Sequence, residues 1–323
     1  MPTIVALCGG VGGAKLAEGL QQVLAPGELT LIVNSGDDFE HRGLPIWPDI
    51  DTVLYTLSGT SNVQQGWGRA DESWSVQAEW RRLGVDTWFQ LGDRDIALHL
   101  LRREWQTLGW PPARICAELA RLFGVTARLL PMAEIPAPTT VVTADGELEF
   151  QEYFVHQRCA PVVRGFRYGG STAAHAASPV AEALADERLD GIILCPSNPF
   201  LSIAPILAIP GLRQLLARSR APVIAVSPII GGEALKGPAA KIMREMGMAA
   251  DPLAVAREYA DFLDLMLVDE RDQAAVPALD GRTAFQAGPI LMRNAADRRA
   301  LAQACLAALP ATAARRTALQ NRP

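Results

Sequence analysis

Four glycines stand between an apolar run and a helical pattern near the start of the chain: Gly9, Gly10, Gly12 and Gly13. Backbone N–H groups and the helix dipole at such a turn attract an anion. The spacing fits neither familiar phosphate-binding pattern. Ala14 stands at the second glycine of a P-loop, and Lys15 stands at the third glycine of G-x-G-x-x-G. The turn therefore predicts a phosphate site of another kind, with a ligand-free strand–helix turn as the alternative.

Carboxylates gather after the second apolar run. The segment "NSGDDFEHRGLPIWPDIDTVLYTLSG" contains Asp37, Asp38, Asp49 and Asp51. Mg²⁺ is held by a few such oxygens and leaves its other positions to phosphates and water. Each residue also has a structural alternative, because Asp49 or Asp51 could cap a helix over residues 52–57, and Asp37 and Asp38 could stabilise a turn.

The segment "LGDRDIALH" repeats the acidic pattern with Asp93, Arg94 and Asp95. An arginine between two aspartates usually forms a local ion pair. The functional alternative is a guanidinium that faces a phosphate or a ligand carbonyl. His99 follows Asp95 by one helical turn, and a packing role is expected for it.

Two later loops follow apolar runs, "CPSNPFLSIAPIL" and "SPIIGGEALKGPAAKIM". Ser197, Asn198 and Ser202 could hydrogen-bond a base or a ribose, although Asn-Pro also marks turns. Gly237 and Pro238 predict a second helix start that is open to an anion. The acidic residues of "VDERD" at 268–272 are expected to be solvated charges.

The elements that position these loops alternate between strand and helix. Buried apolar runs at residues 3–7, 29–33, 191–195, 222–226 and 265–268 predict a Rossmann-like, doubly wound, mostly parallel α/β sheet. The Asp-Gly of "TADGE" predicts a β-hairpin of residues 140–142 and 148–154. We expect one domain over residues 1–310, a last helix over 297–309 and a disordered tail over 311–323.

All seven tryptophans lie between Trp47 and Trp110. Helical periodicity at residues 73–83, 96–108 and 112–123 predicts a Trp-rich helical insertion at about residues 60–130. The rings either pack the insertion together or form a wall against a flat aromatic ligand.

Composition restricts the class of protein. The 323 residues are 49% hydrophobic and carry a net charge of −5, which argues against a nucleic-acid partner. The five cysteines have no metal or redox spacing, so buried thiols are expected. The start has no signal-peptide pattern and no apolar stretch approaches the ~20 residues that span a bilayer, which predicts a cytoplasmic protein without a membrane partner.

Taken in order, the quoted segments, together with "LPM" and "FQEYFV", resemble the signature segments of the 2-phospho-L-lactate transferase family of coenzyme F420 biosynthesis. The resemblance runs from about residue 3 to about residue 272. It implies a Rossmann-like, commonly dimeric enzyme that requires Mg²⁺. Its substrates would be the deazaflavin alcohol Fo and a guanosine-diphosphate-activated three-carbon acid, and GMP would be released.

The resemblance also implies roles for residues. Asp51 and Arg94 match the residues that the family uses around Fo, with Asp49 beside them, and Asp51 and Arg94 would be catalytic. On this basis we hypothesise that Asp51 and one of Asp37 or Asp49 hold Mg²⁺ across the diphosphate, with Asp51 also a candidate acceptor of the ribityl proton. The diphosphate and guanosine would meet the glycine turn and the later loops. The carboxylate set is Asp37, Asp49 and Asp51, and the nucleotide set is Gly9, Gly10, Val11, Gly12, Gly13, Lys15, Ser197, Asn198, Ser227 and Gly231.

Some positions depart from the family pattern. Val11 stands where a small residue is common, Lys15 has no assigned ligand, and either Asp37 or Asp38 could face the metal. Lactyl, glyceryl and enolpyruvyl donors are not separated by any residue. The rival class is a regulatory sugar-nucleotide-binding protein of the gluconeogenesis-factor type, and a NAD-dependent oxidoreductase is a weaker third.

Overall fold

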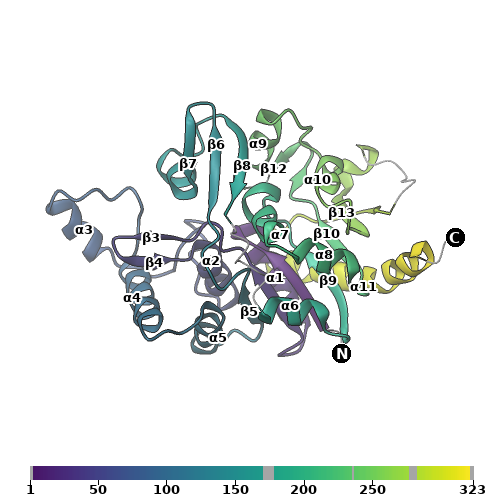
Figure 1. The fold of residues 1–323 in the computed structure, drawn as a ribbon, viewed down its shortest axis with the longest axis horizontal. Helices are drawn as coiled ribbons and strands as arrows, with labels where there is room; N and C mark the ends of the chain where they lie inside the picture. Colours follow the sequence, from purple (N-terminus) through teal and green to yellow (C-terminus); the bar gives the residue numbers. More distant parts are fainter. Residues whose placement is uncertain (1–2, 170–177, 235, 276–281, 321–323) are drawn as a thin grey trace.

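A seven-stranded parallel sheet forms the centre of the protein in a computed structural model, which describes residues 3–169, 178–234, 236–275 and 282–320 (Figure 1). The strand order is β14-β13-β10-β9-β1-β2-β5. Every neighbouring pair is parallel, which confirms the predicted doubly wound sheet. In chain order the strands are β1 (Thr3–Cys8), β2 (Leu29–Val33), β5 (Arg128–Pro131), β9 (Leu189–Leu194), β10 (Val223–Val226), β13 (Leu265–Asp269) and β14 (Ala284–Gly288).

Successive side chains of a strand point to opposite faces of the sheet, so alternate residues pack into the two apolar layers on either side of it. In β1, Ile4 and Ala6 pack with residues of helices α1 (Gly10–Val23), α2 (Pro48–Leu57) and α11 (Ala295–Gln320). Val5 and Leu7 face the opposite layer. That layer includes residues of α6 (Ser178–Ala185), α7 (Ala204–Ala208), α8 (Leu212–Arg218), α9 (Ala239–Glu245) and α10 (Pro252–Glu258).

The Trp-rich stretch contains the helices expected there: α3 (Ser75–Arg82), α4 (Asp93–Thr107) and α5 (Pro112–Leu122). Together with the short hairpin of β3 (Phe39–His41) and β4 (Leu44–Ile46), they lie at one side of the molecule (Figure 1). The helix predicted from residue 52 begins earlier, at Pro48, so Asp49 and Asp51 lie inside its first turn. Neither is the N-cap, which is Trp47.

A separate antiparallel sheet contains the predicted hairpin, in the order β7-β6-β8. Its strands are β6 (Thr139–Thr143), β7 (Gly146–Glu149) and β8 (Val163–Tyr168). The prediction that the second hairpin strand continues to residue 154 is wrong. The strand ends at Glu149, and the chain winds into a π-helical turn, η1 (Glu152–His156).

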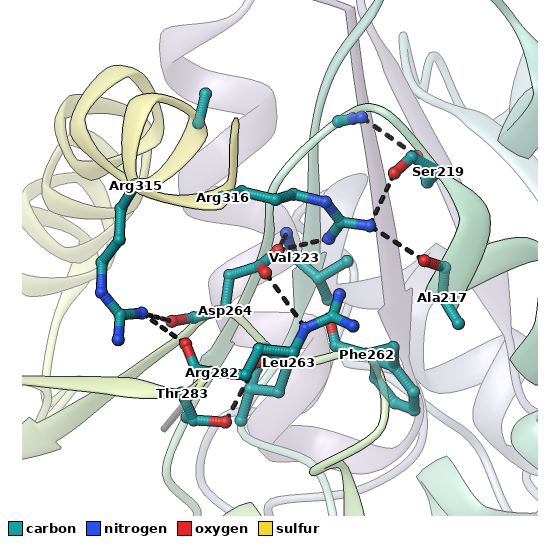
Figure 2. Close-up of polar contacts among 12 residues, drawn as sticks. Ala217, Ser219, Val223, Phe262, Leu263, Asp264, Arg282, Thr283, Arg315 and Arg316 are labelled. Atoms are coloured by element: carbon teal, nitrogen blue, oxygen red, sulfur yellow. Dashed lines mark hydrogen bonds and ion pairs between the residues drawn. The ribbon is translucent and has the colours of Figure 1, made fainter. Parts of the chain in front are cut away.

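The expected tail is also wrong over residues 311–320, which continue helix α11 past Pro310. Residues 321–323 lie outside the described residues. The helix is retained because Arg316, 4% exposed, forms an ion pair of 2.5 Å with the buried Asp264 (Figure 2). The same guanidinium donates to the carbonyls of Ala217 and Ser219, and Val223 N–H donates to Asp264. The end of the helix is therefore fixed to the loops before β10 and β13.

Cysteine burial follows the prediction. Cys8, Cys116, Cys195 and Cys305 are buried free thiols, and Cys159 is half-buried. Over the described ranges, no single helix has the length and apolarity of a membrane span. One pair bent by 88°, Pro199–Ala208 with Leu212–Arg218, passes the same test when its helices are taken together.

Candidate active site

The glycine turn has no room for side chains. A Cβ on Gly12 would lie 2.4 Å from the Pro196 carbonyl oxygen, and a Cβ on Gly9 would lie 2.3 Å from a carboxylate oxygen of Asp49. Gly10 has φ +62°, which favours glycine. The helix begins at Gly10 rather than at Ala14, so the glycines themselves form the first turn, whose N–H groups have no partner within the helix. This is the geometry of an anion site.

Asn34, at the end of β2, joins two of the predicted metal ligands. Its amide donates to Asp37 at 3.2 Å and to Asp49 at 2.8 Å. The other oxygen of Asp49 accepts the Gly10 N–H at 2.7 Å. The acidic segment is thereby fixed to the glycine turn.

Crowding of carboxylates opposes their ionisation. Burial raises the pKa of Asp49 to about 6, against hydrogen bonds from Asn34, Gly10 and other donors. Burial raises the pKa of Asp37 well above its ordinary value, and the charge of Asp49 adds to the rise. Burial likewise raises the pKa of Asp38, whose Oδ1 has no hydrogen-bond partner among the described residues. A cation bound here would relieve this repulsion.

Asp51 has a partner that sequence reasoning missed. Both of its oxygens accept hydrogen bonds from Arg102, whose side chain has no exposed surface. Arg102 also donates to the Pro45 carbonyl at 3.0 Å and lies 4.3 Å above the centre of the Trp47 ring. Asp51 is therefore a fixed, charge-paired carboxylate.

Asp95 and His99 share the buried face of α4 with Arg102. Tyr55 donates its hydroxyl to Asp95 at 2.6 Å. Burial raises the pKa of Asp95 to about 6, and burial lowers the pKa of His99 to about 4. His99 Nδ1 lies 3.1 Å from the Arg102 guanidinium, so its packing role is confirmed.

The glycine turn and the aspartates line one cavity of about 830 Å³. Asp51 and Gly12 are both in its wall, so the acidic segment and the turn share one site. The sequence-predicted residues that line it are Gly9, Gly10, Val11, Gly12, Lys15, Asp37, Asp49, Asp51, Ser197, Asn198 and Ser227, and Ser202 and Asp95 join them.

Aromatic rings form another part of the wall: Trp67, Trp88, Phe89, Phe150 and Phe154. Trp88 stacks on His156, with 5.0 Å between ring centres. Other tryptophans pack the insertion: Trp47 and Trp105 are buried in the core. The packing interpretation is confirmed for Trp47 and Trp105, and a wall against an aromatic ligand stays a prediction for Trp67 and Trp88, which line the cavity.

Two lysines add positive charge to the cavity. Lys15 donates to the Met292 carbonyl at 3.3 Å. Burial lowers its pKa, and the nearby charges of Arg298 and Lys236 lower it further. Lys236 lines the same cavity, so an anionic ligand is the expected occupant of this end.

Three predicted residues lie outside the cavity wall. Gly13 is buried behind the turn, where a Cβ would lie 2.3 Å from Ser197 Oγ. Gly231 donates its N–H to Asp272. Arg94 is exposed, its NH1 lies 3.5 Å from the Ala70 carbonyl, and it forms no ion pair within the described ranges. The local ion pair expected for Arg94 is therefore not found.

The acidic segment at 268–272 differs from the expectation of solvated charges. Asp269 is 6% exposed and pairs with Arg271, and Asp272 is 5% exposed. Asp272 accepts the Gly231 N–H at 2.9 Å. It therefore fixes the loop that follows Ser227 at the edge of the cavity.

The sequence does contain a pattern from which the role of Arg102 could have been predicted. Asp95, His99 and Arg102 follow one another at spacings of four and three, which places them on one helical face. Leu98 and Trp105 on the same helix are buried, so this polar stripe lies on an inward face. No comparable signal marks Asn34.

The fold and cavity define a Rossmann-like α/β enzyme with an anion-binding turn beside an acidic and aromatic pocket. The profile of the family described as "2-phospho-L-lactate transferase CofD" matches residues 4–295. The chain belongs to this family, and it is a transferase of coenzyme F420 biosynthesis. The expectation from the sequence resemblance is confirmed.

Comparison with individual relatives supports the same family. The phosphoenolpyruvate transferase of Kitasatospora aureofaciens is 41% identical over 312 residues, which cover 94% of this chain and 97% of the relative. The 2-phospho-L-lactate transferase of Methanosarcina mazei is 38% identical over 271 residues, covering 84% and 88%. The solved structure of protein BH3568 from Bacillus halodurans has a TM-score of 0.62 at 16% identity, over 94% of this chain and 99% of that chain. It supports the fold alone.

Proposed function

We propose that the protein transfers a phospho-three-carbon-acid group from a guanosine-diphosphate-activated donor to the ribityl hydroxyl of Fo, with release of GMP. The observation that carries this proposal is the shared cavity, where the glycine turn, the aspartates and the aromatic wall meet. Such a transfer needs mainly positioning and charge neutralisation.

The donor diphosphate fits the positively charged end of the cavity. The first turn of α1 presents backbone N–H groups to an anion, and Lys15 and Lys236 supply positive charge. Ser197 already spans the turn, since its hydroxyl donates to the Gly9 carbonyl at 2.9 Å. It therefore supports the turn, while Asn198 and Ser227 remain candidates for guanosine contacts.

Fo fits the part of the cavity that is lined by aromatic rings. Its fused rings are flat, and Trp88, Phe89 and Phe154 offer surfaces for offset stacking. Asp51 lines the same cavity, two residues after Asp49 and four before Tyr55 on helix α2. The role of Arg94 at Fo stays a prediction, because its exposed side chain would have to move to reach the cavity.

Mg²⁺ fits Asp37 and Asp49 best. The two carboxylates share Asn34, and burial raises the pKa of both; the charge of Asp49 adds to the rise for Asp37, and a cation would offset these effects. Mg²⁺ commonly binds through one or two carboxylates and substrate phosphates. No cluster of three or more metal-binding side chains occurs in the described part of the chain. Asp51 fits less well, since the positive charge of Arg102 is already paired with its carboxylate. Bound Mg²⁺ would neutralise charge on the diphosphate.

The three-carbon acid is enolpyruvyl or lactyl, the two groups named in the relatives' activities. We also propose that the enzyme acts in the cytoplasm as a homodimer, as the resemblance implies. Sedimentation of the purified protein tests the dimer.

The decisive experiment supplies Fo, Mg²⁺ and guanylated phosphoenolpyruvate, phospholactate or phosphoglycerate in parallel. GMP release and product mass are measured for each donor. The proposal expects GMP and a phosphodiester of Fo with at least one donor. Nucleotide binding without GMP release from any donor would instead favour the regulatory class of protein.

A further inference from the structure

Two carboxylates of the cavity, Asp37 and Asp95, have one oxygen without a hydrogen-bond partner among the described residues, and Asp37 is the proposed Mg²⁺ ligand. Both oxygens of Asp49 accept hydrogen bonds, from Gly10 and Asn34. Both oxygens of Asp51 accept them from Arg102. In Asp95, Oδ1 accepts the Tyr55 hydroxyl, and Oδ2 has no hydrogen-bond partner over the ranges described.

We propose that Asp95 accepts the proton of the attacking ribityl hydroxyl, an assignment that rests on the proposed function. The hydroxyl oxygen forms a bond to the phosphorus that carries the three-carbon acid. The bond from that phosphorus to the GMP phosphate oxygen breaks, and GMP leaves with the electron pair. The hydroxyl proton moves to Asp95 Oδ2. Asp51, the proton acceptor expected from the sequence, becomes instead a fixed anion paired with Arg102.

The position of Asp95 is determined by its surroundings. It lies in the first turn of α4, where its backbone N–H donates to Glu72 at 3.0 Å. Oδ2 lies 3.8 Å from the place that a Cβ on Gly68 would occupy, and both residues line the cavity. A side chain at position 68 would contact this oxygen, and glycine leaves that side of it uncovered.

The groups that face Asp95 tune it for proton transfer. Burial raises its pKa to about 6; the Tyr55 hydrogen bond and the charge of Arg69 oppose the rise, while the charges of Asp51 and Glu72 add to it. A general base works best when its pKa lies near the pH of operation. The uncharged His99 adds no positive charge nearby.

The first test replaces the base. Asp95→Asn should lower kcat by about 10²–10⁴-fold, the usual contribution of general acid–base catalysis, and change the Kd for Fo by less than about threefold. Glu104→Gln removes an exposed carboxylate from the same helix and should keep full activity. Circular dichroism confirms that both variants fold.

The second test measures kcat/KM against pH and follows the acidic limb, which is the pH range over which kcat/KM falls as the base becomes protonated. Tyr55→Phe removes a hydrogen bond to the ionised carboxylate, so the limb should move to higher pH. Glu72→Gln removes a neighbouring negative charge, so the limb should move to lower pH. A merely structural role would not produce shifts of opposite sign.

Three results would overturn the assignment. Near-normal kcat in a folded Asp95→Asn variant excludes Asp95 as the base. An acidic limb at the wild-type pH in both Tyr55→Phe and Glu72→Gln also excludes Asp95 as the base. A wild-type protein that releases no GMP from any donor overturns the proposed function, and the assignment with it.

Discussion

Arg102 donates hydrogen bonds to both oxygens of Asp51 from a position with no exposed surface. Taking two charges out of water is costly, and the pair offsets that cost only while both members are present. The Asp51–Arg102 pair therefore connects the stability of the insertion to the geometry of the active site.

Arg102→Gln should lower the free energy of unfolding by about 3–5 kcal/mol, because Asp51 is then buried without its counter-ion. Urea unfolding measures this loss. Adding Asp51→Asn to Arg102→Gln should restore part of the stability, since no unpaired charge remains. Simple additivity of the two single effects would contradict the coupling.

Asp51→Asn should lower kcat by about 10²–10³-fold, since a centrally placed electrostatic group is lost. It should also lower the free energy of unfolding, because Arg102 is then buried without its counter-ion, so circular dichroism must confirm that the variant is folded at the assay temperature. Arg94→Gln should have a much smaller effect, because the exposed Arg94 lies outside the cavity wall. Steady-state kinetics with Fo compares them. Equal losses in both variants would show that Arg94 moves into the cavity when Fo binds.

Gly12→Ala should weaken GDP binding by at least about tenfold. The added methyl would lie 2.4 Å from the backbone oxygen of Pro196, so the turn must shift. Isothermal titration calorimetry measures the Kd. Gly165→Ala is the matched control, because that glycine has no atom within 4 Å of the added Cβ and no positive φ. Unchanged GDP affinity in Gly12→Ala would remove the turn from the nucleotide site.

Stability without Mg²⁺ should fall as pH rises from about 4 through about 6. The pKa of Asp49 is raised from 3.8 to about 6 on folding, so the folded state binds more protons than the unfolded state in this window. The resulting loss of stability is complete above pH 6. Thermal unfolding at pH 4.5 and 7.5 measures it.

Asp49→Asn removes the ionisable group, so it should be more stable than the wild type at pH 7.5 and similar to it at pH 4.5. Mg²⁺ should raise the Tm of the wild type at pH 7.5 and have less effect on this variant. Glu149→Gln, at an exposed position, should behave like the wild type. An equal Mg²⁺ effect in all three proteins would place the metal elsewhere.

Arg316→Met should lower the free energy of unfolding by about 3–5 kcal/mol, because it leaves Asp264 buried with one fewer counter-ion. Arg299→Met, at an exposed position of the same helix, should change it by less than about 0.5 kcal/mol. Guanidinium unfolding compares the two. Similar values would show that the ion pair does not hold the helix end.

Local signals predicted most of the sheet and the turn. β1, β2, β9, β10 and β13 are continuous apolar runs that end in polar loops, and buried parallel strands have this pattern. β5 and β14 were not predicted. They form the two edges of the sheet, where burial is less complete, and β5 begins at the exposed Arg128.

Pairings between distant residues could not be predicted. Arg102 and Asp51 are 51 positions apart, and Arg316 and Asp264 are 52 apart. An arginine is normally exposed, and only the tertiary fold supplies the partner that permits burial. The C-terminal segment is rich in alanine, threonine and arginine and lacks an apolar face strong enough to distinguish a packed helix from a frayed one.

The attachment of the last helix has a consequence for synthesis on the ribosome. β10 and β13 are translated before Arg316, so a growing chain holds Asp264 without this counter-ion until helix α11 has been made. The contacts that hold the loops before these strands are therefore completed late in synthesis.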